Sequence, residues 1–406
     1  MFTFASLTTI TTELLTAPKI NLTVRLFPFN TVVTPDPGKI PPDSLNWAEF
    51  HNGVASALRI SPSATGIDSS WISFNKPPEM TNEHAGFLYG LGLTGHLKCL
   101  VTWHVFSYLT LKHDLLSIGF LLGLCASYVG TGHHDVARVL AVHVPALLPT
   151  QDADLNVSLL TQAAGLVGAG LLFMGTKNRR IAVTMLEQMK RKELLQPDLS
   201  NEHREAYTIA SALAFGMIMV GRGEKTDSPA DDRVIYRIRL LIHGEPPTNN
   251  EGQPKKKTFD VNITSPAASM ALAMMYLRTN RKDIADILTI PSTVLELNHI
   301  QPNFLLVRTI GRALIMWDNI KPTIEWIERQ VPEAILVAVA TARLQRRPLE
   351  GSIELAYHHI ISGACFALGL KYAGTARDEV YKTIIRFYDM FSRPPQPGGE
   401  YSKKFA

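Results

Sequence analysis

Two kinds of segment alternate along most of the chain: apolar stretches rich in glycine and alanine, and more polar amphipathic stretches. Each apolar stretch follows one pattern, in which a small residue is followed five positions later by an aromatic residue or methionine. Two positions further on, a glycine or another turn former usually follows. The full or partial pattern comprises Gly123, Tyr128, Gly130; Gly168, Phe173, Gly175; Ala214, Met219, Gly221; Ala271, Tyr276, Arg278; Gly311, Met316, Asp318; Ala367, Tyr372, Gly374; and a shortened copy at Gly90. Recurrence of this kind predicts a repeat protein.

The apolar stretches predict helices that pack closely on one another. A second small residue lies four positions before the first in six copies, and residues four apart share one helical face. These earlier positions are Gly86, Gly119, Ala164, Ala210, Ala267 and Gly363. Small residues on one face let a neighbouring backbone approach. The aromatic residue or methionine fills the space beside that groove, and the following glycine suits a left-handed helix C-cap.

The repeat predicts a mostly α-helical solenoid of helix–turn–helix units, because no single unit can bury its apolar face alone. We place this solenoid at residues 48–385. Residues 1–47 are expected to be extended or β, with a strand at Leu22–Leu26, and residues 386–406 to form a tail. Two insertions are expected, at 222–264 and 320–355. Within the first, VIYRIRLLIH and TFDVNI alternate as strands do, and predict a small β insertion that also takes in the N-terminal strand.

Composition argues against several other classes of protein. Apolar residues make up 46% of the 406 residues and charged residues 19%, which suits a large hydrophobic core and not a disordered chain. The 40 basic and 36 acidic residues nearly cancel, so the charge offers no basis for nucleic-acid binding. The cysteines are Cys99, Cys125 and Cys365. They form no CxxC pair, and we interpret them as small core residues in a reducing compartment.

Two uncharged stretches, 115–132 and 159–176, reach the lower length limit for a membrane-spanning helix. Both are rich in small residues and end in Gly-Thr, and each is followed by a charged amphipathic segment. A glycine-rich helical membrane protein therefore stays an alternative, but we favour buried helices of a solenoid.

The motifs typical of catalysis and of ligand binding are weak. GLGLTG at residues 90–95 matches GxGxxG, with Asp114 at a suitable distance, but a dinucleotide site needs a strand before the motif. The preceding residues have the character of a helix start, and the motif is one member of the repeat. His133–His134 and His358–His359 are adjacent pairs, and Cys99 follows His96 by three residues, which falls short of a zinc site. We predict no catalytic, metal-binding or cofactor-binding residues.

The repeat and several local strings resemble those of a known family. The glycine-rich helix pairs are similar to the proteasome/cyclosome repeat, and several strings are similar to the largest subunit of the anaphase-promoting complex, the cyclosome. These strings are WAEFHNGVASALRI, AGFLYGLGLTGHL, SIGFLLGLCAS, TFDVNITSPAASMALAMMYLRTN and FLLVRTIGRALIMWD. The likeness covers residues 45–385, and the related proteasome regulatory particle scaffold stays an alternative.

The resemblance implies a closed or strongly curved α-solenoid that acts as a non-catalytic scaffold in a ubiquitin ligase controlling mitosis. It implies protein partners, among them the substrate-recruiting co-activator and the small degron-binding subunit, and a location in nucleus and cytoplasm. It implies no nucleic acid, membrane, cofactor or small-molecule substrate as partner.

Overall fold

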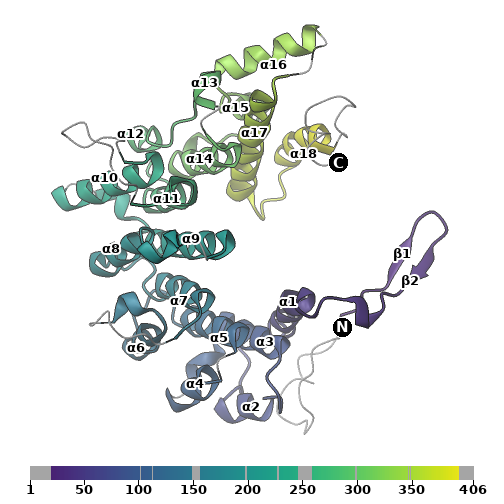
Figure 1. Cartoon of the computed structure of the whole chain (residues 1–406), viewed down its shortest axis with the longest axis vertical. Helices are drawn as coiled ribbons and strands as arrows, with labels where there is room; N and C mark the ends of the chain where they lie inside the picture. The colour runs from purple at the N-terminus through teal and green to yellow at the C-terminus, as the bar shows by residue number, and fades with distance from the viewer. Residues whose placement is uncertain are drawn as a thin grey trace. The chain divides into compact units, whose positions relative to one another are not determined.

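The computed structural model is built almost wholly from helices (Figure 1). It describes residues 20–100, 102–111, 113–148, 156–196, 199–225, 228–245, 258–297, 300–345, 347 and 349–392. The chain divides into two compact units, Met1–Met185 and Leu186–Ala406. Each unit is a stack of helix pairs, so the predicted mostly α-helical solenoid is confirmed.

The first unit begins with a β-hairpin. Strands β1 (Val24–Leu26) and β2 (Thr31–Val33) pair antiparallel, with Arg25 opposite Val32. All six strand residues are exposed. The strand predicted at residues 22–26 therefore exists, but it pairs with the segment directly after it and not with the 222–264 insertion.

The α-helices of the first unit follow the hairpin, and the eighth runs across the boundary between the units. Their bounds are α1 (Asn46–Ala57), α2 (Ser69–Phe74), α3 (Asn82–Leu93), α4 (Thr102–Leu109), α5 (Asp114–Ser127), α6 (His134–His143), α7 (Leu159–Leu172) and α8 (Arg179–Gln188). Short 3₁₀ turns lie at Pro37–Lys39, Pro42–Leu45, His96–Cys99 and Pro145–Leu147.

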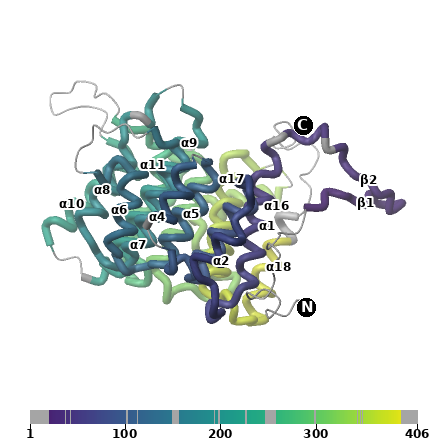
Figure 2. The backbone as a smooth tube through the Cα atoms, turned by 90° about the horizontal axis from the view of Figure 1, so that it is seen from below, coloured from purple at the N-terminus to yellow at the C-terminus, as the bar shows by residue number. Residues whose placement is uncertain are grey.

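One row of helices organises the first unit. Helix α1 packs on α3, α3 on α5, and α5 on α7, and Figure 2 traces their backbones. Helices α4 and α6 pack on the outside of this row, against α5 and α7. The core between them includes Phe50, Leu88, Phe120 and Leu140, each at most 3% exposed. Helices α3, α5 and α7 contain apolar segments of the sequence pattern, and together with α1 we call them the inner helices of this unit.

The second unit repeats this arrangement with longer connections. Its α-helices are α9 (Asn201–Ile218), α10 (Pro229–His243), α11 (Val261–Met275), α12 (Lys282–Ala285), α13 (Val294–Leu297), α14 (Pro302–Ile315), α15 (Ile324–Glu328), α16 (Glu333–Gln345), α17 (Gly351–Tyr372) and α18 (Asp378–Ser392). Its 3₁₀ turns lie at Lys192–Leu195, Arg222–Lys225 and Trp317–Asn319. The inner helices α9, α11, α14 and α17 pack in chain order, and α10 lies on α11.

Local sequence explains where many of these helices begin. A side chain at the N-cap accepts a hydrogen bond from a backbone N–H of the first turn, which otherwise has no partner. Such caps are provided by Asp68, Thr81, His113, Ser158, Ser200, Ser228, Asp260 and Thr323. Pro229 and Pro302 occupy the first helical position, where the lack of an N–H costs nothing.

The β structure predicted within 222–264 is wrong, because VIYRIRLLIH lies inside helix α10. Its buried residues Val234, Ile238, Leu241 and Ile242 follow a spacing of four, seven and eight, whereas Tyr236 is 61% exposed. The apolar residues of this segment fit both the two-residue period of a strand and the 3.6-residue period of a helix. The Ser228 N-cap and Pro229 at the first helical position favour the helix. TFDVNI is likewise not a strand, since Asp260 caps a helix that begins at Val261.

Two other predicted boundaries, at residues 355 and 386, also fall within helices. The 320–355 insertion contains α15, α16 and the first residues of α17. Helix α18 continues to Ser392, so the start of the expected tail at 386 falls inside it. Residues 393–406 of that tail, and residues 246–257 of the first insertion, lie outside the described residues.

Candidate functional site

The inner helices of the first unit touch backbone to backbone at their glycines. A Cβ atom added to Gly86 on α3 would lie 1.7 Å from the carbonyl oxygen of Phe50 on α1. On the facing surface, a Cβ on Gly53 would lie 1.9 Å from the carbonyl oxygen of Glu83. Such distances leave no room for any side chain at these two positions, so the backbones of α1 and α3 are in direct contact.

The same contact continues from α3 to α5. A Cβ on Gly92 would lie 2.2 Å from the Cα atom of Gly123, and one on Gly119 would lie 2.5 Å from the carbonyl oxygen of Ala85. Gly90 faces the other side, where an added Cβ would lie 2.6 Å from the Ala57 side chain on α1. Gly168 on α7 is less tightly enclosed, with Cys125 Sγ at 3.0 Å.

The second unit uses alanine more often than glycine at these positions. Ala214, Ala271 and Ala367 are fully buried on α9, α11 and α17. Gly363 on α17 meets backbone, because an added Cβ would lie 2.7 Å from the carbonyl oxygen of Leu306 on α14. At Gly311 the neighbour is instead the end of the Leu288 side chain, also at 2.7 Å. Of the small-residue positions named from the sequence, Gly86, Gly119, Gly123 and Gly363 therefore lie where the backbones of inner helices meet.

The turn after each inner helix also repeats. The aromatic residue or methionine of the pattern caps the helix C-terminus at Tyr128, Phe173, Met219, Tyr276 and Met316; Tyr372 is the last residue of α17. The glycines two residues later are left-handed, with φ of +71° at Gly130, +67° at Gly175, +72° at Gly221 and +73° at Gly374. Arg278 takes the same conformation, with φ of +61°, without being glycine.

These turns join one inner helix to the next by hydrogen bonds. The N–H of Gly130 donates to the carbonyl of Leu171 at 3.0 Å, at the end of α7. In the second unit the N–H of Arg278 donates to the carbonyl of Leu314 at 3.0 Å, at the end of α14. Helix C-termini leave carbonyls without partners, so these two turns supply donors to the end of the next inner helix.

One set of residues in these turns is not identified by the sequence analysis. A threonine follows the left-handed residue four times, and its hydroxyl donates to the carbonyl of the capping aromatic residue at 2.7–2.8 Å. The four are Thr131, Thr176, Thr279 and Thr375. The recurring Gly-Thr at the end of the apolar stretches is the signal that indicates them.

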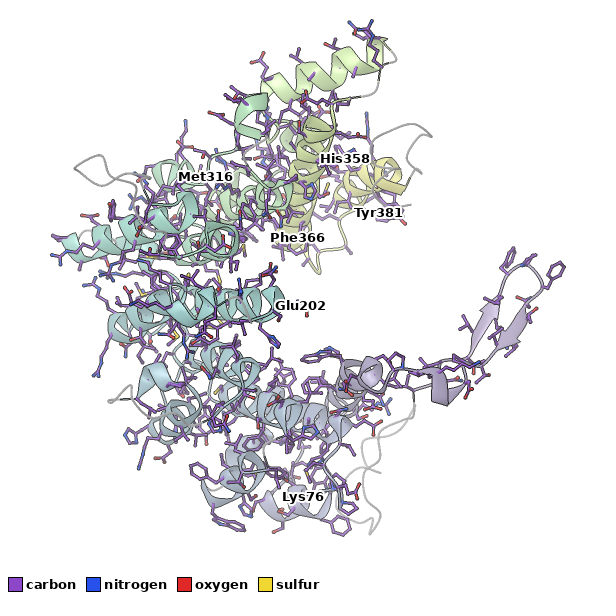
Figure 3. All side chains as sticks on the ribbon, viewed as in Figure 1. Lys76, Glu202, Met316, His358, Phe366 and Tyr381 are labelled. Atoms are coloured by element: carbon purple, nitrogen blue, oxygen red, sulfur yellow. The ribbon has the colours of Figure 1, made fainter. Side chains whose placement is uncertain are left out.

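Exposed apolar side chains mark the surfaces available to other proteins. At the tip of the hairpin, Phe27 is 91% exposed and Phe29 88%. In the second unit, Phe366 on α17 and Tyr381 on α18 are 58% and 64% exposed (Figure 3). Contiguous patches of such groups are typical of protein–protein contact sites, whereas single exposed apolar residues are common on any protein.

The motifs considered for chemistry form neither a dinucleotide-binding turn nor a metal cluster in the described parts of the chain. Gly90 and Gly92 of GLGLTG belong to helix α3, so no strand precedes the motif as a dinucleotide site requires. No group of three or more His, Cys, Asp or Glu side chains in the described parts of the chain is placed to hold a metal ion. Burial raises the pKa of the Cys365 thiol to about 11 and raises that of Cys125 further, which keeps both protonated at neutral pH.

The two stretches tested as membrane spans form helices α5 and α7 of 14 residues each, most of which are buried in the first unit. One helix of the described chain, α17, is long and apolar enough to cross a membrane by length and composition. Half of its most apolar window is buried within the protein, and one such helix is weak evidence for a membrane span, because core helices pass the same test.

Two protein-family models match the chain and together cover most of it. The model described as APC1 fourth domain matches residues 1–129, and the model described as APC1 fifth domain matches residues 134–406. The boundary between the two matches follows α5 and precedes α6.

Curated relatives are similar over nearly the whole chain. Anaphase-promoting complex subunit 1 of Schizosaccharomyces pombe is 38% identical over 97% of this chain and 26% of its own length. The human protein of the same name is 39% identical over 95% of this chain and 21% of its own length. Negative regulator of mitosis of Emericella nidulans is 37% identical over 98% of this chain and 19% of its own length. The chain thus spans about a fifth to a quarter of these relatives.

Proposed function

Since this chain belongs to the anaphase-promoting complex subunit 1 family, we propose that it is a scaffold segment of that complex, without catalysis of its own. The observation that carries this proposal is the backbone-to-backbone packing of the inner helices at Gly86, Gly92 and Gly363. A stack without intervening side chains has little freedom to repack. Such a body suits the task of holding other subunits in fixed positions.

The proposal names a particular assembly and a task within it. The complex is a multi-subunit ubiquitin ligase that controls mitotic progression, and the name of the Emericella nidulans relative agrees with a mitotic role. The co-activator that recruits substrates and the small degron-binding subunit are the partners we propose, with the chain in nucleus and cytoplasm. Ubiquitin transfer belongs to other subunits.

The exposed apolar side chains support docking of proteins and not of small molecules. Phe27 and Phe29 extend from a two-stranded hairpin that buries none of its own strand residues. An isolated two-stranded hairpin is marginally stable in water. Packing against a partner protein would stabilise this hairpin. The proteasome regulatory particle is the weaker assignment, because both family models are APC1 domains.

Affinity purification of the tagged chain from dividing cells, followed by mass spectrometry, tests the assignment. We expect recovery of the cullin, RING and helical-repeat subunits of the anaphase-promoting complex. A Gly86→Leu variant, in which the α1–α3 contact cannot form, is the matched control and should recover less. Recovery of proteasome regulatory subunits, or of no subunits of either assembly, would contradict the proposal.

A further inference from the structure

The second unit contains a cavity of about 550 Å³. Its walls come from the end of α10, the start of α11, α14, and the segment between α12 and α14. This volume lies within the range of cavities that hold small ligands or short peptide ends. The apolar part of the wall includes Ile242, Ile290, Pro291, Ile300 and Phe304.

A buried cation lies in the wall of this cavity. Arg308 is only 4% exposed, and its Nη1 donates to the carbonyl of Thr289 at 2.9 Å. Its Nε is buried without a hydrogen-bond partner, and no carboxylate among the described residues forms an ion pair with it. A buried charge without a counter-charge is costly. The arginine therefore offers an unused donor and an unneutralised charge to a ligand.

Two further groups in the wall are ready for hydrogen bonds. The hydroxyl of Ser265, on the buried face of α11, also has no partner within the described chain, and the residue is 1% exposed. Directly after it, Pro266 lies inside the helix and has no N–H, so the carbonyl of Asn262 lacks its usual α-helical donor. The cavity thus combines donors for an anion with an acceptor suited to a peptide N–H.

Arg308 makes the buried end of the cavity positively charged, and the other ionisable groups of the lining do not neutralise it. His243 also lines it, and its Nε2 lies 2.9 Å from the carbonyl of Ile287. Burial is the main cause that lowers the pKa of His243, and the positive charges of Arg308 and Arg239 lower it further. Glu296 is the acidic residue of the lining, and it is exposed on α13.

We propose that this cavity binds the C-terminal carboxylate and the last apolar side chains of another polypeptide. A planar guanidinium matches a carboxylate with two parallel hydrogen bonds, and the Ser265 hydroxyl adds a third donor. A chain end enters a cavity from one side only, whereas an internal acidic residue must bring chain on both sides. A phosphate dianion fits less well, because Arg308 is the only arginine or lysine in the described lining.

This inference rests on the proposed scaffold function only for the source of the chain end, which would be another subunit. Its test uses the whole 406-residue chain and synthetic peptides, so it can fail while purification still recovers the complex. The probe is acetyl-Leu-Phe with a free carboxylate, and the readout is the Arg308 Nε–H resonance in arginine-labelled protein. We expect a saturable shift, and roughly tenfold weaker binding for acetyl-Leu-Phe-amide, since charged hydrogen bonds are worth more than neutral ones.

Two variants separate binding from folding. Ser265→Ala removes a hydroxyl without a described partner, so it should fold normally and weaken binding severalfold. Arg308→Gln should abolish the saturation seen by amide resonances, whereas Arg312→Gln, one turn later and outside the cavity lining, should not. Equal affinity for the amide, equal affinity for acetyl-Phe-Glu-Phe-amide, or no binding of the free carboxylate would each overturn the proposal.

Discussion

Two glycines of helix α17, six residues apart, differ in whether the structure has room for one added methyl group. A Cβ on Gly363 would lie 2.7 Å from the carbonyl oxygen of Leu306, whereas one on Gly369 would have nothing within 4 Å. We expect Gly363→Ala to lower the free energy of unfolding by about 1–3 kcal/mol, because the backbones must separate. Gly369→Ala should raise it by roughly 0.5–1 kcal/mol, since alanine favours helix.

Chemical unfolding of both variants beside the parent chain measures this difference. The pair shares one helix, so helix propensity is matched and only the neighbouring backbone differs. If both substitutions were stabilising, close packing at Gly363 would play no part in the stability of the second unit.

At the same scale, His84 makes the stability of the first unit depend on pH. Burial, together with the positive charge of Lys76, lowers the pKa of His84 from 6.5 to about 4. Below pH 6.5 the unfolded chain takes up a proton that the folded chain does not. Stability contributed by the neutral side chain is therefore complete above pH 6.5 and falls towards pH 4, by up to about 1.4 kcal/mol per pH unit.

Urea unfolding at several pH values between 7 and 4, compared with a His84→Phe variant, isolates this contribution. The ring of His84 lies among those of Phe87 and Tyr108, and its Nε2 has no described partner, so phenylalanine should fit. The difference in unfolding free energy between the two chains should change with pH below about 6.5 and stay constant above pH 7. Parallel pH curves for the two would show that His84 titrates normally in the folded protein.

At the scale of an element, the turns after the inner helices carry stability that depends on one hydroxyl each. Thr279 donates to the carbonyl of Tyr276 at 2.8 Å, directly after the left-handed Arg278. Thr279→Val keeps the shape but removes this bond, and should cost about 0.5–1.5 kcal/mol. Thr279→Ser retains the hydroxyl and should cost less. Hydrogen exchange at the amides of Arg278 and Asn280, which donate to α14, should accelerate in the valine variant alone.

The elements also show how far the sequence could predict this structure. Small residues four apart identified the faces of α3, α5 and α17, because a spacing of four has one geometric meaning in a helix. The spacing of apolar residues could not distinguish a strand from helix α10, because alternation and helical spacing coincide from Val234 to Ile242. The cavity at Arg308 was beyond prediction, since it joins residues from α10, α11 and α14 that are up to 66 positions apart.

At the scale of the whole molecule, substitutions of exposed side chains can test partner binding without changing the free energy of unfolding. Phe27 and Phe29 are 91% and 88% exposed, so replacing both by serine removes no buried area. We expect the double variant to unfold within about 0.5 kcal/mol of the parent, as surface substitutions do. Recovery of partner subunits should nevertheless fall, because these rings belong to the proposed docking surface.

Leu344→Ser is the matched control for this variant, since Leu344 is 86% exposed on α16 and lies outside the hairpin. Gly86→Ala gives the opposite case, in which the α1–α3 contact is strained while every exposed apolar group remains. A scaffold whose docking surface includes the hairpin should lose partners in the hairpin variant without losing stability, and lose stability first in the glycine variant. Unchanged recovery of every subunit by the hairpin variant would remove the hairpin from the docking surface and leave α17 and α18 as the apolar surfaces to test.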